Sequence, residues 1–382
     1  MSVLSLPWFG WMAVTVAGYW CMPGRLREFW LVGVTLAFLV MHAPESTVIL
    51  LVMTAATYLL TNRDHVSGPL AITAAAGIVA LLASYKLQVS GQFTDIVRDV
   101  AIPLGLSYYS FRCLHYVIER YKGTIPPQTP GDLVSYLFFL PSMLAGPIHR
   151  YPQFSRDRRR KRWDSGQFSE GLERILYGYV KIAFLANFVV SVKLAEFIAG
   201  IDPSQTALIA YLDILRHSLN LYFQFSGYSD VAIGFALLLG YRVMENFNWP
   251  FLKSNISEFW RSWHISLSSW CREYVYMLVV STTRSAALGA VSAMLVLGLW
   301  HELSLRYVVW GLYHGCGIVV WQGFQHVKAA LPVVENLWLL RSLRALSVLL
   351  TFHFVIFGFT IVKEPDLGSA VDALARVLLF WM

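Results

Sequence analysis

The chain has 382 residues, of which 57% are hydrophobic and 14% charged, and its formal net charge is +7. Soluble domains carry about 25% charged residues, so this composition excludes an ordinary soluble protein and predicts a polytopic membrane protein. The long apolar stretches lack the alternation of barrel strands, which favours an all-α bundle. The cysteines stand singly in apolar segments, so neither a disulfide framework nor a metal site is predicted.

Hydrophobic stretches predict membrane-spanning helices from one end of the chain to the other. Several are shorter than the roughly 20 residues that a perpendicular span needs, and about 10–12 hydrophobic elements are expected when partial ones are included. The whole chain, residues 1–382, is predicted to be a single membrane domain. The expected spans cover residues 4–22, 29–41, 47–60, 69–84, 171–199, 206–225, 286–300, 307–324 and 343–362.

Residues 135–162 combine a broken hydrophobic stretch with a basic run. Pro141, Gly146 and Pro147 interrupt the first part, which predicts a partial or re-entrant element rather than a clean span. The run SRDRRRKRW is predicted to be cytoplasmic by the positive-inside rule. Its basic residues could dock an acidic carrier or only contact lipid headgroups, and they do not indicate nucleic-acid binding. They are Arg156, Arg158, Arg159, Arg160, Lys161 and Arg162.

Ionisable side chains interrupt two otherwise apolar segments. Arg112, His115 and Glu119 fall within residues 99–123, and Asp230 falls near the end of a later span. Such groups are costly inside a membrane bundle and commonly line a cavity, although they could also lie near a membrane edge. Asp230 is therefore a candidate substrate-binding residue.

Residues 246–272 form the most polar and aromatic stretch of the chain. Read as a helix from Ser257, the stretch predicts a polar stripe on one face and an aromatic stripe on roughly the opposite face. The polar stripe consists of Ser257, Arg261, His264, Ser268 and Arg272. The opposite face carries Phe259, Trp263, Leu267, Trp270 and Tyr274. A polar face of this kind in a membrane protein makes the stretch a candidate for the functional site.

Three histidines are candidate functional residues: His264, His301 and His314. His301 ends a hydrophobic run in LGLWHEL, where loss of hydration keeps an imidazole neutral and suited to general-base catalysis. A hydrogen-bonded packing role is the alternative for each histidine. On one continuous helix His314 would lie about 220° from His301, so a joint role requires a break between them. No catalytic-triad order, glycine-rich phosphate loop or HExxH motif is visible.

Five segments, in order along the chain, resemble the membrane-bound O-acyltransferase family. They are IPLGLSYYSFRCLHYVIERYKG, LAGPIHRYPQF, LYFQFSGYSDVAIG, ENFNWPFLKSNISEFWRSWHISLSSWCREYVY and GLWHELSLRYVVWGLYHG. The resemblance covers residues 102–317. It is nearest to the bacterial branch, whose members include proteins of alginate O-acetylation and of D-alanyl transfer to teichoic acid.

The resemblance implies a helical bundle with a through-tunnel, which an acyl donor enters from the cytoplasmic side. His301 matches the family's catalytic histidine in a Trp-His motif, and His264 matches a second family histidine in an Arg-x-Trp-His segment. Glu302 departs from the pattern, because many bacterial members have glycine there, and its carboxylate could orient the base or alter acceptor preference. No permanently bound cofactor is implied, because the donor is a thioester, either acetyl-CoA or a phosphopantetheinyl carrier protein.

The predicted function is transfer of an acetyl or D-alanyl group across the bacterial inner membrane. The acceptor would be a hydroxyl of a cell-envelope polysaccharide or an extracytoplasmic relay acyltransferase. The predicted substrate-binding residues, of which the arginines would meet donor phosphates, are Arg261, Trp263, Ser268, Arg272, Asp230, Trp300 and His314. A transporter or flippase of an envelope precursor is the alternative. It would depend on Asp230 or Glu119 and predicts inverted repeats, which are not visible.

Overall fold

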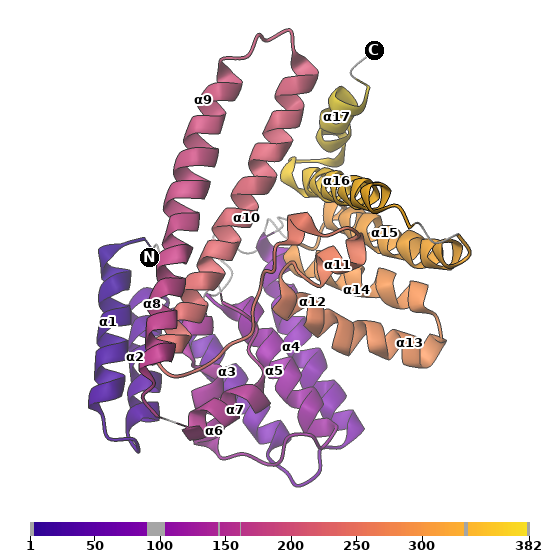
Figure 1. Ribbon diagram of the computed structural model, residues 1–382. Coiled ribbons are helices and arrows are strands. Elements are labelled where there is room, and N and C mark those ends of the chain that lie inside the picture. Colours follow the sequence, from indigo (N-terminus) through magenta and orange to yellow (C-terminus); the bar gives the residue numbers. More distant parts are fainter. Residues whose placement is uncertain (1–3, 90–103, 144–145, 161, 332–334, 380–382) are drawn as a thin grey trace. The chain divides into compact units, whose positions relative to one another are not determined.

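The computed structural model describes residues 4–89, 104–143, 146–160, 162–331 and 335–379 (Figure 1). The described residues form helices joined by turns and loops, with an isolated antiparallel bridge between Phe247 and Trp263, which confirms the predicted all-α class. The chain divides into two compact units. Unit 1 comprises Met1–Val180 with Gly227–Met244, and unit 2 comprises Lys181–Ser226 with Glu245–Met382. The single membrane domain stays a prediction, and Ile102, its expected first motif residue, lies outside the described residues.

Unit 1 begins with four helices at the positions of the first four predicted spans. Ser5 begins the first helix as its N-cap, with its hydroxyl accepting the Trp8 N–H at 3.4 Å. A capping box between Thr129 and Asp132 begins α6 in the same way. The helices are α1 (Leu6–Cys21), α2 (Arg27–His42), α3 (Pro44–Thr61), α4 (Gly68–Val89), α5 (Leu106–Tyr121), α6 (Pro130–Leu137), α7 (Tyr151–Arg160) and α8 (Ser165–Tyr179).

The ionisable residues of α5 are buried and bonded to neighbouring segments of unit 1. Arg112 donates to the Tyr136 carbonyl, and the His115 ring accepts the Tyr151 N–H at 3.1 Å. The Glu119 carboxylate accepts from Lys122 at 3.0 Å. The two predicted alternatives, a cavity or a membrane edge, stay predictions, while Arg112 and His115 bond α5 to neighbouring segments. The reason is that a buried polar group is costly unless it is hydrogen-bonded.

The predicted break in residues 135–154 is confirmed. α6 ends at Leu137, and a short 3-10 turn, Leu140–Ser142, follows around Pro141 before α7 begins at Tyr151. Proline removes a backbone donor and clashes with the preceding turn, so no helix continues through this position.

Unit 2 holds the three candidate histidines, His264, His301 and His314. A π-helical stretch, Val180–Lys193, continues α8 into α9 (Leu194–Ala199), and α10 (Thr206–Leu238) follows. By length and composition, four of the described helical runs could cross a membrane: Pro44–Thr61, Gly68–Leu87, Ser165–Ala199 and Leu337–Lys363. The remaining helices are α11 (Ile256–Trp260), α12 (Ile265–Cys271), α13 (Met277–Thr283), α14 (Ala286–His301), α15 (Leu305–Ala329), α16 (Leu337–Lys363) and α17 (Leu367–Leu378).

Glycines set the separation between α14 and α15. A Cβ added at Gly298 would lie 2.4 Å from the Tyr307 carbonyl oxygen, and one at Gly311 would lie 2.8 Å from the Met294 carbonyl oxygen. Both distances are too short for any side chain, so the backbones touch here only because these residues are glycine. Because of this contact, the end of α14 that holds His301 packs against the first turns of α15.

The continuous amphipathic helix expected from Ser257 is wrong. α11 ends at Trp260, and His264 adopts the left-handed conformation (φ +44°) before α12 begins. The break arises because Asn246 binds this segment. Its carbonyl accepts the Ile265 N–H at 2.9 Å, and its side-chain oxygen accepts the Ser266 hydroxyl at 2.6 Å. A backbone that pairs with a distant strand-like segment cannot also complete the helical bond pattern.

Candidate functional site

A pocket of about 220 Å³ lies in unit 2 among α11, α12, α14 and α15. Four of the five residues of the predicted polar stripe line it despite the helix break, namely Ser257, Arg261, Ser268 and Arg272. His264 does not line it. The residues predicted for the opposite, aromatic face are buried. Most of the predicted polar stripe therefore lies on one wall of this pocket, which is built from two short helices and a π turn, Arg272–Tyr276. Its functional role stays a prediction.

The pocket combines positive charge with apolar walls. Arg261 and Arg272 are exposed, and their guanidinium groups make no ion pair or hydrogen bond with the residues that the structure describes. Met294 and Leu297 of α14 supply apolar wall, and Gln322 of α15 supplies an amide. Free guanidinium groups present a fork of donors that matches phosphate geometry, so the pocket suits an amphiphile with an anionic end.

His264 is buried beside two aromatic rings. Its side chain is 2% exposed, and its ring lies 4.6 Å from Phe225 and 6.0 Å from Trp300, measured between ring centroids. The residue sits at the junction of two short helices, outside the long apolar ones. Burial, with a smaller effect of positive charge on His301, lowers the pKa of His264 to about 3. The imidazole is therefore neutral at physiological pH.

His301 is the last residue of α14 and is exposed. Its ring centroid lies 4.4 Å from that of Trp300, and it stacks on Tyr307 at 5.6 Å with an interplanar angle of 21°. Trp300 thus contacts both His264 and His301. The two predicted catalytic histidines therefore both contact one tryptophan ring, although they come from segments that are far apart in the chain.

His314 lies apart from this pair. The helix does break between His301 and Leu305, as a joint role requires, and both histidine rings pack against Trp310. The His314 ring is fully buried, with ring centroids 5.2 Å from Trp260 and 4.8 Å from Trp310. It does not line the pocket. Its substrate-binding role stays a prediction that these contacts do not favour.

Two further predicted residues have packing partners. Asp230 belongs to unit 1, where its carboxylate pairs with Arg174 at 2.8 Å. Trp263 is buried against Phe251 and Phe359. Neither residue lines the 220 Å³ pocket. The structure thus gives both of them a stabilising role, and their substrate contacts stay predictions.

Sequence reasoning missed Tyr307 and Phe225, which pack against the two histidines. Tyr307 is one of several aromatic residues in RYVVWGLYHG, and nothing in its spacing singles it out. The contact depends on the close approach of α14 and α15. A glycine at position 298, one turn before His301, was the available signal.

The basic run is partly neutralised within unit 1. The Arg158 guanidinium binds Asp132 and lies 3.6 Å from the Glu28 carboxylate, and Arg156 lies 3.5 Å from Asp157. Lys161 lies outside the described residues. Docking of an acidic carrier therefore stays a prediction for the rest of the run, and Arg158 has a structural role.

Residues 85–354 match the family model of the membrane-bound O-acyltransferases. The match covers more than half of the chain, which therefore belongs to this family. It is an all-α membrane protein, as the composition predicted.

Three relatives illustrate the range of the family. The probable alginate O-acetylase of Pseudomonas aeruginosa is 33% identical over 72% of this chain and 51% of its own length. The teichoic acid D-alanyltransferase of Bacillus subtilis is 30% identical over 68% of each chain. The peptidoglycan O-acetyltransferase of Helicobacter pylori is 24% identical over 96% of this chain and 77% of its own length. The matched region spans about half the length of the alginate O-acetylases.

Proposed function

We propose that this protein is an O-acyltransferase of the bacterial inner membrane. It transfers an acetyl or D-alanyl group from a cytoplasmic thioester toward a hydroxyl of a cell-envelope polysaccharide or of a relay acyltransferase. The observation that carries this proposal is the convergence of His264 and His301 on Trp300, beside a pocket with two arginines that make no ion pair among the described residues. The names of the relatives, an alginate O-acetylase and a teichoic acid D-alanyltransferase, supply the two candidate acyl groups.

His301 is the proposed general base. In its neutral form, the imidazole takes the proton of the acceptor hydroxyl while the hydroxyl oxygen attacks the thioester carbonyl. The tetrahedral intermediate then collapses, the carbon–sulfur bond breaks, and the thiolate takes a proton from the imidazolium. The product is an ester and a free thiol, with the histidine restored. The exposed position of His301 at the helix end leaves its ring accessible to an acceptor.

His264 is proposed to support this step as a neutral hydrogen-bond donor. A buried imidazole that stays uncharged can donate one N–H to the carbonyl oxygen as negative charge develops there. It does so without first losing a hydration shell, because its surroundings are Phe225 and Trp300.

The pocket is proposed to hold the phosphopantetheine arm of the donor. Arg261 and Arg272 would bind its phosphate, and Ser257 and Gln322 offer partners for its amides. Leu297 lines the pocket four residues before His301, which corresponds to about 6 Å along the helix axis. A flexible arm anchored at the arginines can therefore extend to the histidines. Acetyl-CoA and a carrier protein present the same arm, so the pocket serves either donor.

The test replaces His301 with alanine in a strain whose own gene is deleted. Acetate and D-alanine are released from the isolated envelope polysaccharide by mild alkali and quantified. The expected result is loss of the ester at normal protein level. His326→Ala is the matched control, because His326 is an exposed histidine of α15 without a bonded partner among the described residues. Unchanged ester content in His301→Ala would reject the proposal.

A further inference from the structure

The turn that follows His301 is short, and the helix after it begins without a side-chain cap bond among the described residues. Glu302 is extended (φ −156°, ψ 140°), and α15 begins two residues after Leu303. Ser304 occupies the N-cap position of α15, but its side chain makes no capping bond among the described residues. A helix start without a cap leaves backbone donors to be satisfied elsewhere. The position of this turn, and of the histidine before it, must therefore be set by other contacts.

Arg306 supplies those contacts. Its Nη2 donates to both carboxylate oxygens of Glu302, at 3.1 and 3.3 Å, and its Nη1 donates to the backbone carbonyl of Glu364 at the end of α16. A planar guanidinium can donate hydrogen bonds to two acceptors in fixed directions at once, and a lysine ammonium does not offer this rigid geometry. The Arg306 side chain is 22% exposed, so its ion pair is less screened than a surface pair.

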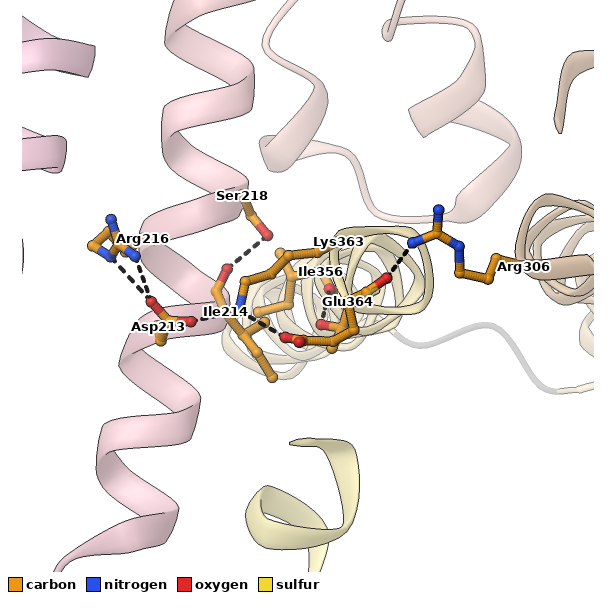
Figure 2. A network of polar contacts seen from close by, with 9 residues as sticks. Asp213, Ile214, Arg216, Ser218, Arg306, Ile356, Lys363 and Glu364 are labelled. Carbon is orange, nitrogen blue, oxygen red and sulfur yellow. Dashed lines mark hydrogen bonds and ion pairs between the residues drawn. The ribbon is translucent and has the colours of Figure 1, made fainter. Parts of the chain in front are cut away.

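The contacts continue across α16 to α10 (Figure 2). Lys363 donates to the Glu364 carboxylate at 2.9 Å and also to Asp213, and Asp213 accepts from Arg216 at 2.7 Å. Cations and carboxylates alternate from Arg216 to Glu302, so their charges balance. Balance matters because an uncompensated charge in a partly buried place is strongly destabilising. The network thus ties the turn after His301 to two other helices of unit 2.

Tyr307, which directly follows Arg306, connects the network to His301. Its ring stacks on His301, and Trp310, one turn further along α15, lies 6.0 Å from the same ring. Any shift of Arg306 therefore moves the surface on which the imidazole rests. We propose that Glu302 and Arg306 are positioning residues, which fix the His301 ring through the α14–α15 turn and Tyr307. The inference rests on the proposed function, in which His301 is the base.

The test measures kcat and KM in inverted membrane vesicles that contain the endogenous acceptor. [14C]acetyl-CoA and a D-[14C]alanyl phosphopantetheinyl carrier protein are supplied in separate series. Arg306→Gln is expected to lower kcat about 10- to 100-fold, because small misplacements of a catalytic group have effects of this size. The donor KM should stay within about twofold of the wild-type value, since the pocket is untouched. The kcat of Arg306→Lys should lie between those of the wild type and Arg306→Gln.

Two further variants separate positioning from folding. Glu302→Gln removes the charge of the partner with little change of shape, and combined with Arg306→Gln it should lower kcat no further, because both substitutions break the same contact. Arg344→Gln is the matched control, since Arg344 is an exposed arginine of α16 without a bonded partner among the described residues.

The inference is overturned if Arg306→Gln and Glu302→Gln both keep wild-type kcat, or if only KM changes. If Arg306→Gln fails to accumulate, Glu302→Gln alone decides the question. An active His301→Ala variant would reject the proposed function itself. An inactive His301→Ala with a fully active Arg306→Gln would reject the positioning role alone.

Discussion

Replacing Gly298 with alanine perturbs the contact on which the candidate site depends. The added Cβ would lie 2.4 Å from the Tyr307 carbonyl oxygen and 3.4 Å from the Trp310 ring. Relieving the first contact requires α14 and α15 to separate by roughly 1 Å, and overpacking of this kind typically costs about 1–3 kcal/mol. A displacement of about 1 Å at a catalytic group can cost about 100-fold in rate. Activity is therefore expected to fall far more than stability.

The matched control is Gly323→Ala. Gly323 also lies in α15, but no atom lies within 4 Å of its added Cβ. Alanine is a better helix former than glycine by about 1 kcal/mol, so this variant should be at least as stable as the wild type and fully active. The measurements are the unfolding temperature in detergent and the ester content of the envelope polysaccharide. If the Gly298→Ala protein keeps the wild-type unfolding temperature and ester content, the close contact of α14 and α15 does not set the site.

Two other variants test the pocket and the competing transporter interpretation. Changing both Arg261 and Arg272 to glutamine should raise the donor KM about tenfold or more and leave kcat nearly unchanged, because the variant loses phosphate binding but keeps the catalytic histidines. An unchanged KM in vesicle assays would show that the pocket does not bind the donor. Asp230→Asn breaks the pair with Arg174 and should lower the unfolding temperature. It should leave acyl transfer per folded molecule intact, whereas a transport function dependent on this carboxylate predicts loss of activity with normal folding.

Hydrophobic stretches predicted the helices well because length and apolar composition are local properties of the chain. α14, for example, covers Ala286–His301 where a span was expected at residues 286–300. The central stretch was predicted less well. Its residue pattern located the pocket wall, but the break at His264 depends on bonds to Asn246, and helical periodicity contains no information about such distant partners.

The partners of charged residues could not be predicted from the sequence either. Arg158 was grouped with a basic run, yet it binds Asp132 and Glu28 from other helices of unit 1. Glu302 departs from the family pattern, which the sequence shows, but its ion pair with Arg306 is visible only in the folded structure. Residue type and spacing can nominate an ionisable group, whereas its role depends on what the fold places beside it.

Acyl transfer by the His301→Ala protein is the most direct test of the central claim. Inverted vesicles with wild-type, His301→Ala or His326→Ala protein at equal levels are supplied with each of the two labelled donors, and label incorporated into alkali-labile ester is counted. Incorporation from one donor is expected for the wild-type and His326→Ala proteins, and none above background for His301→Ala. Equal incorporation by His301→Ala would contradict the central claim.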